Sequence, residues 1–155
     1  MDLHTGRVTD FDFLIGDWTI SNRRLKQRWV GSDDWDTFSS IATCEHRLGG
    51  VGNVEQIDCP DRGFSGMSVR LFDLADSRWS IYWASSDVGR LQPPVRGGFE
   101  GNVGIFEGLD SDEGSPMFVR FTWTVADADH ARWQQAFSRD EHWETNWIMD
   151  FTRAD

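Results

Sequence analysis

Three side chains between positions 46 and 82 have the chemistry for acid–base catalysis. Glu55 lies in the middle of a short alternating segment, and His46 and Tyr82 stand in neighbouring segments of the same kind. A carboxylate beside an imidazole or a phenol at a cavity wall can move a proton on a bound substrate. Glu55, His46 and Tyr82 are therefore the catalytic candidates, and an ordinary surface position is the alternative for each.

The sequence lacks the familiar motifs of cofactor and metal chemistry. It has no phosphate-binding glycine loop, no HExxH, no paired CxxC and no GxSxG. The histidines, His4, His46, His130 and His142, are far apart in the sequence, so we predict no metal site. We also predict no cofactor. Haem is a minor alternative, with His46 or His142 as its axial ligand.

A second set of side chains has the character of a ligand-binding wall. The chain contains nine Trp and eleven Phe, a large stock of aromatic area for 155 residues. Apolar walls with a few placed polar groups are typical of small-molecule pockets. The ligand-binding candidates are Trp83, Trp123, Gln135 and Trp147, together with Asn22 and Arg120 if their strand face points inward. A filled core, in which the tryptophans only pack, is the alternative.

Strands with period-two alternation must position these side chains. Gly, Asp, Asn and Pro clusters divide the sequence into predicted strands over residues 18–30, 35–46, 51–57, 65–73, 78–85, 99–109, 116–125, 131–138 and 142–153. Residues 9–15 are expected to form a short helical turn, and residues 87–98, which contain two prolines, a long loop. We predict one all-β domain over residues 1–155, an antiparallel up-and-down barrel of about eight to ten strands.

The alternation also predicts which face of each strand points inward. We place the apolar sets inside, including Trp143, Thr145, Trp147, Met149 and Phe151 of the last strand. The opposite face carries Asn22, Arg24, Arg70, Arg120, Glu144, Asn146 and Asp150. We expect that face to be solvated, and a polar network inside the barrel is the alternative.

The segment FDFLIGDW, residues 11–18, resembles the start of calycin barrels. NRRL at 22–25, LGGVGNVEQI at 48–57 and the stretch from Arg132 to Arg153 extend the resemblance to a bacterial family of uncharacterised, calycin (lipocalin-like) proteins. The resemblance implies that Trp18 closes one end of the barrel and that Arg153 packs across its ring. It implies no particular reaction.

Charge and cysteine content restrict the class of partner and the compartment. The formal net charge is −11, which disfavours binding to nucleic acid or to an anionic membrane. We expect Cys44 and Cys59 to be free thiols of a cytoplasmic protein, with a disulfide as the alternative. Residues 1–10 lack the apolar core of a secretion signal, and no apolar run approaches about 18 residues.

Three functional hypotheses follow from these features. The first is binding of a small hydrophobic or aromatic metabolite in a tryptophan-lined barrel cavity. The second is a cofactor-independent enzyme of the cyclase, isomerase or dehydratase type, acting on a small-molecule biosynthetic intermediate. The third is a protein–protein module in which Trp29 and Trp35 form an exposed patch. A homodimer is compatible with all three.

Overall fold

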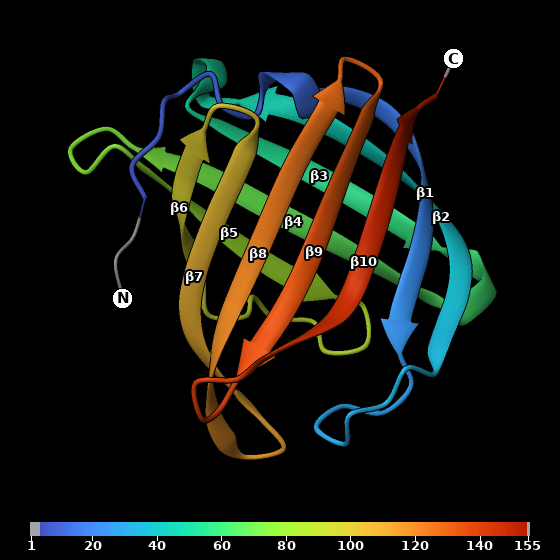
Figure 1. Cartoon of the computed structure of the whole chain (residues 1–155). Coiled ribbons are helices and arrows are strands. Elements are labelled where there is room, and N and C mark those ends of the chain that lie inside the picture. The colour runs from blue at the N-terminus through green and yellow to red at the C-terminus, as the bar shows by residue number, and fades with distance from the viewer. Residues whose placement is uncertain (1–3, 155) are drawn as a thin grey trace.

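Ten antiparallel strands form a closed barrel in the computed structural model, which describes residues 4–154 (Figure 1). The strands are β1 (Gly16–Leu25), β2 (Trp35–Arg47), β3 (Gly52–Cys59), β4 (Phe64–Asp73), β5 (Arg78–Ser85), β6 (Val95–Glu100), β7 (Val103–Asp112), β8 (Ser115–Asp127), β9 (His130–Ser138) and β10 (Trp143–Arg153). Each strand pairs with the next in the chain, and β10 returns to pair with β1. The predicted up-and-down barrel is confirmed.

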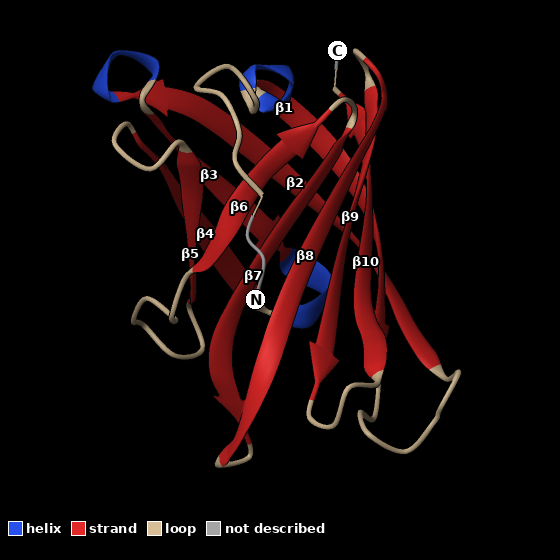
Figure 2. Cartoon of the chain, turned by 60° about the vertical axis from the view of Figure 1, so that its left-hand side comes forward, coloured by secondary structure: helices blue, strands red, loops and turns tan. Residues whose placement is uncertain are grey.

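One end of the barrel is closed by the segment that precedes β1. A short helix, η1 (Asp12–Leu14), lies at this end beside the start of β1 (Figure 2). It buries Leu14, as the turn predicted for residues 9–15 implies. The indole N–H of Trp18 donates to the Leu14 carbonyl at 2.8 Å. The guanidinium of Arg153 lies 4.2 Å from the Trp18 ring centroid and donates to the carbonyls of Phe13 and Ile15. The expected contact between Arg153 and Trp18 is confirmed.

The first strand is shorter than the alternation predicts. It ends at Leu25, and residues 26–34 form a loop at the opposite, open end of the barrel. The predicted strand continues to residue 30 because Trp29 and Val30 are apolar. Trp29 instead adopts a positive φ of 72° and turns back toward the ends of β7 and β10. Hydrogen bonds from its backbone and its indole to distant residues therefore outweigh the local preference for a strand.

The prediction of a loop over residues 87–98 is wrong for residues 95–98, which belong to a strand. Pairing resumes at Val95, directly after the two prolines, and a turn at Gly101 and Asn102 divides the predicted strand 99–109 into β6 and β7. Gly97 makes β6 hard to predict from the sequence, because glycine is uncommon in strands. A Cβ at Gly97 would lie 2.0 Å from the Ile105 carbonyl oxygen, so the close approach of β7 requires glycine.

A β-bulge in β10 reverses the faces predicted for its first residues. The register with β9 shifts between Thr145 and Trp147, leaving Asn146 as the additional residue. Trp147 therefore points inward as predicted, but Trp143 and Thr145 do not share its face. Trp143 packs outside, and the carboxylate of Glu144 turns toward the open end, where it accepts a hydrogen bond from the Trp29 backbone N–H.

No helix among residues 4–154 is long and apolar enough to cross a membrane. The expectation that the chain has no secretion signal rests partly on residues 1–3, which lie outside the described residues.

Candidate functional site

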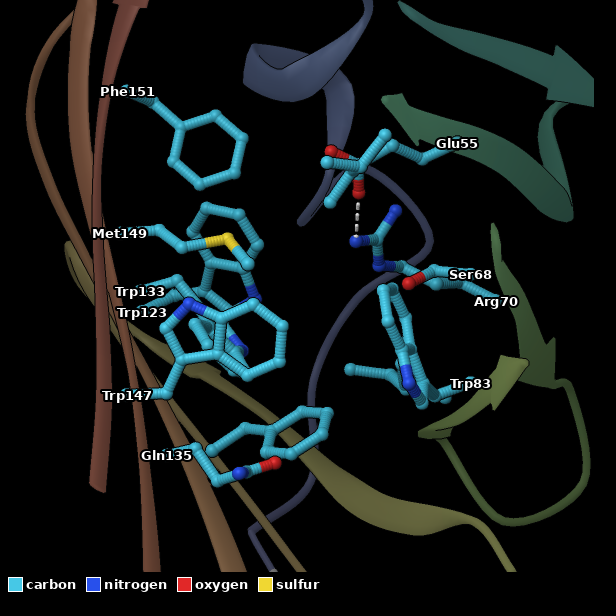
Figure 3. A pocket seen from close by; sticks show the side chains of 13 residues that line it. Glu55, Ser68, Arg70, Trp83, Trp123, Trp133, Gln135, Trp147, Met149 and Phe151 are labelled. Carbon is cyan, nitrogen blue, oxygen red and sulfur yellow. Dashed lines mark hydrogen bonds and ion pairs between the residues drawn. The ribbon is translucent and has the colours of Figure 1, made fainter. Parts of the chain in front are cut away.

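The barrel encloses a cavity whose walls are mainly aromatic (Figure 3). Strands β8 to β10 supply one wall, and β3 to β5 supply the wall that faces it. The rings that line it belong to Trp83, Phe121, Trp123, Trp133, Trp147 and Phe151. Its volume is about 40 Å³, which is room for a few water molecules, since each needs roughly 10–15 Å³. We call this space the inner cavity.

A wider compartment of about 250 Å³, the mouth, lies between the inner cavity and the open end of the barrel. Its rim carries the polar side chains of Arg28, Gln92 and Asp112. Trp83 and Trp147 line both compartments and meet with ring centroids 6.2 Å apart at an interplanar angle of 87°. Because β5 and β10 are not neighbours in the barrel, these two indoles contact each other across its interior. They form a neck between the mouth and the inner cavity.

Trp147 is held in place by polar contacts on the side away from the neck. Its indole N–H donates to Asn22 Oδ1 at 3.0 Å, and Asn22 Nδ2 donates to the Ser40 hydroxyl at 2.8 Å. The guanidinium of Arg24 lies 4.9 Å from the centroid of the same indole. Asn22, predicted as a ligand-binding residue, thus lies behind the wall and orients one of its rings.

Trp83 is positioned by the shape of the strand beside it. Its ring lies directly over Gly66 on the adjacent strand β4. A Cβ at Gly66 would come within 1.9 Å of the ring, so any larger residue would displace the indole. The absence of a side chain at Gly66 therefore sets the width of the neck.

A buried ion pair stands at the wall of the inner cavity. Glu55 and Arg70 have side chains that are 1% and 3% exposed, and Arg70 Nη2 donates to Glu55 Oε1. Arg70 Nη1 donates to Asn53 Oδ1 at 2.9 Å, and its guanidinium lies 5.0 Å and 5.8 Å from the ring centroids of Phe11 and Trp123. The barrel interior therefore contains two opposite charges that neutralise each other, with aromatic rings beside the guanidinium.

The pair does not use all of its hydrogen-bonding capacity. Within residues 4–154, Glu55 Oε2 and Arg70 Nε are buried and have no hydrogen-bond partner. The same is true of Asn146 Nδ2, whose Oδ1 accepts from Gln135 Nε2 at 2.8 Å. Glu55, Arg70 and Gln135 all line the inner cavity, so side chains that carry an unused acceptor and an unused donor belong to its wall.

Both cysteines are free, buried thiols. Burial raises the pKa of the Cys44 thiol to about 11, and it also raises the pKa of Cys59. A thiolate, not a thiol, is the reactive form, so neither sulfur is a ready nucleophile near neutral pH. Cys44 Sγ instead lies 3.6 Å from Asn53 Oδ1, beside the buried ion pair.

Only one of the three catalytic candidates lies at the cavity. Glu55 lines the wall, but His46 is exposed near the closed end, 3.8 Å from Asp12. In β2 His46 alternates in phase with the inward-facing residues that end at Cys44. It lies beyond the end of the barrel interior, however, and is exposed. Tyr82 alternates with Ile81 and Trp83 and therefore lies on the outer face, opposite Val69. The structure does not assemble Glu55, His46 and Tyr82 into one site.

The polar face predicted to be solvated is divided between inside and outside. Arg120 does point outward, where it pairs with Glu107 and lies 3.9 Å from the Trp143 ring centroid, so it does not contact the cavity. Asp150 is also on the outer face, paired with Arg132. The members that turn inward are Asn22, Arg24, Arg70, Glu144 and Asn146. For these residues the prediction is wrong, because internal partners offset the cost of burial.

The histidines do not fit an axial haem ligand in the barrel. His46 lies outside the closed end, and His142 is exposed in the loop between β9 and β10. Over residues 4–154, no group of three or more His, Cys, Asp or Glu side chains could hold a metal ion. The described lining of the inner cavity combines aromatic and aliphatic side chains with Ser68, Gln135 and the Glu55–Arg70 pair.

The loop over residues 26–34 is fastened to the rim of the mouth. Arg28 forms two hydrogen bonds with Asp112, at 2.6 Å and 2.9 Å, and the Trp29 indole N–H donates to the same carboxylate at 2.8 Å. Arg28 holds the pKa of Asp112 below its ordinary value. Trp29 also stacks on Phe137, so it belongs to this fastening and does not form an exposed patch. No sequence motif predicts this fastening, since its partners are far apart in the chain.

No protein-family model matches the chain, and no curated protein matches it.

Proposed function

We propose that the barrel binds a small hydrophobic or aromatic molecule in its tryptophan-lined interior. The observation that carries the proposal is the neck, where Trp83 and Trp147 stand between an open mouth and an inner cavity with unsatisfied polar atoms. Aromatic walls supply affinity for an apolar ligand, and a few polar groups orient it. A barrel built only for packing has no use for unpaired polar groups at its centre.

The volumes indicate how a ligand would be placed. The inner cavity, at about 40 Å³, admits a substituent or the edge of a ring, whereas the mouth, at about 250 Å³, admits the body of the molecule. The ligand would therefore lie along the barrel axis and pass the neck. Passing the neck requires Trp83 to move, and Trp83 is the less constrained of the two indoles.

The first experiment is native mass spectrometry of the freshly purified protein, with an absorption spectrum of the same sample. A bound small mass would identify the occupant. A second experiment titrates an apolar fluorescent probe into the protein and into Trp83→Ala and Trp147→Ala. Both substitutions should weaken probe binding about tenfold or more, because each removes part of the neck.

Trp143→Ala is the matched control, since Trp143 is a tryptophan of the outer face. It should leave probe binding unchanged. Equal binding by the unchanged protein, Trp83→Ala and Trp147→Ala would show that the probe does not enter the barrel, and the proposal would then be withdrawn.

Glu55 favours a second candidate function, cofactor-independent catalysis of a cyclisation, isomerisation or dehydration. Glu55 lines the inner cavity, and within residues 4–154 its buried oxygen Oε2 has no hydrogen-bond partner. A positioned carboxylate that accepts a proton can accelerate such reactions roughly 10²–10⁴-fold. The test is to incubate the molecule found by mass spectrometry with the protein and with Glu55→Gln, and to follow its conversion by liquid chromatography. Conversion at equal rates by both proteins would exclude Glu55 as the base.

A further inference from the structure

We infer that the ligand is a neutral aromatic compound with a phenolic or enolic hydroxyl group, and that this hydroxyl binds between Glu55 Oε2 and Arg70 Nε. The inference rests on the proposed function of the same cavity and specifies the chemistry of its occupant.

The unused atoms of the buried pair define the polar group of the ligand. Glu55 Oε2 can only accept a hydrogen bond and Arg70 Nε can only donate one, and neither has a partner within residues 4–154. A hydroxyl group does both, since its proton donates to the carboxylate and its oxygen accepts from the guanidinium. A hydroxyl does so through a single oxygen atom, whereas an amide needs two separate atoms, its N–H and its carbonyl oxygen, and an ether or ketone satisfies only the guanidinium.

The charge of the site excludes an ionic ligand. Glu55 and Arg70 already neutralise each other, with side chains 1% and 3% exposed. An ammonium group at Glu55 Oε2 would lie beside the Arg70 guanidinium, and a carboxylate at Arg70 Nε would lie beside Glu55. Like charges repel strongly in such a water-poor interior, so a neutral group is the one that fits.

The neck determines the body of the molecule. A hydroxyl in the inner cavity carries its parent skeleton into the neck, where Trp83 must turn away from Trp147, whose ring it meets edge to face, to admit the ligand. Planar rings are the shapes that pack best between indole faces and edges. The remaining part of the ligand extends into the mouth, beside Gln92 and Arg28.

Three probes that share one aromatic skeleton test the inference by calorimetric titration of the unaltered protein. 2-Naphthol has the hydroxyl, 2-fluoronaphthalene has a substituent of similar size that cannot donate, and 2-naphthylmethylammonium has a cation. We expect 2-naphthol to bind about 10- to 100-fold more tightly than either of the others, the range for a hydrogen bond to a charged group.

A pair of variants locates the preference at Glu55. Glu55→Gln puts an amide in place of the carboxylate, and the advantage of 2-naphthol over 2-fluoronaphthalene should fall to about threefold or less. Glu107→Gln makes the same change opposite an arginine on the outer face, where Glu107 pairs with Arg120. It should leave the advantage intact. If Glu55→Gln does not fold, the three probes on the unaltered protein still decide the matter.

The outcomes separate the inference from the proposed function. Equal affinity for 2-naphthol and 2-fluoronaphthalene overturns the inference and leaves an apolar binding protein. Tighter binding of the ammonium probe also overturns it, because the site would then recognise cations. If none of the three binds, the proposed function fails together with the inference.

Discussion

Removal of one partner of the buried Glu55–Arg70 pair is predicted to lower the free energy of unfolding of the barrel strongly. Arg70→Met eliminates the hydrogen bonds to Glu55 and Asn53 and leaves a carboxylate that is 1% exposed without its counter-charge. Loss of one member of a buried pair costs about 3–5 kcal/mol, a fifth or more of the roughly 5–15 kcal/mol typical of a domain. Urea unfolding followed by tryptophan fluorescence should show a midpoint lower by roughly 1.5–2.5 M, for a slope of about 2 kcal/mol/M.

The double variant Glu55→Leu/Arg70→Met removes the stranded charge as well. Apolar side chains of similar volume replace buried ion pairs at little cost, so the double variant should recover most of the lost stability. It should also lose the preference for a hydroxyl-bearing ligand. Stability and ligand chemistry would then be separated in one protein, since the fold would no longer depend on the pair.

Arg120→Met provides the control for the loss of an arginine as such. The Arg120 side chain is 34% exposed and pairs with Glu107 on the outer face, an arrangement worth about 0–1 kcal/mol. Its stacking on Trp143 adds about 0.5–1 kcal/mol. If Arg120→Met and Arg70→Met destabilise the protein equally, or if the double variant is no more stable than Arg70→Met, the account of the buried pair is incorrect.

Three further predictions concern the neck and its surroundings. Gly66→Ala forces the Trp83 indole aside, so it should cost about 1–3 kcal/mol in urea unfolding and change the near-ultraviolet circular dichroism; an unchanged spectrum would contradict the close packing. Asn22→Leu strands the Trp147 indole N–H, which should cost about 1–3 kcal/mol, and a neutral result would mean that Asn22 does not hold the ring. The raised pKa of Cys44, about 11 against an ordinary 9.0, means that the native protein binds more protons than the unfolded chain in between. Stability should therefore fall between these pH values, by at most about 1.4 kcal/mol per pH unit, and Cys44→Ala should remove that part of the slope.

Much of the barrel could be predicted because alternation is a local property of each strand. In β5 and β8 the apolar set points inward along the whole strand, which placed Trp83 and Trp123 correctly on the cavity wall. The contact between Trp18 and Arg153 followed from resemblance to known barrels, and the structure contains it. In these places the side-chain pattern and the tertiary structure agree.

The bulge in β10 could not be predicted from alternation. One additional residue at Asn146 keeps the alternation intact on each side but reverses its phase, so Trp143 and Glu144 exchange faces. In the structure Trp143 is exposed and Glu144 points inward, which is the opposite of what hydrophobicity favours. Contacts from other strands, Arg120 to Trp143 and the Trp29 backbone to Glu144, determine the outcome.

The ion pair was missed for a related reason. An arginine and a glutamate in alternating strands resemble solvated residues, and only the pairing register shows that they meet. In that register Asn53 lies opposite Arg70 and Glu55 opposite Ser68, which brings the arginine within reach of both Asn53 and Glu55. Glu55 was recognised as a candidate, but the partners expected for it, His46 and Tyr82, lie elsewhere.

The pairing of β1 with β10 determines when the chain can become a barrel during its synthesis. Arg153 donates to the carbonyl of Phe13 across 140 positions, so this closure waits until β10 has been made. At about 5–20 residues per second, the delay between the synthesis of Phe13 and that of Arg153 is roughly 7–28 s. Throughout that interval the backbone groups of β1 that later pair with β10 are open to other strands. The nascent protein is therefore most exposed to association with neighbouring chains just before its last strand is added.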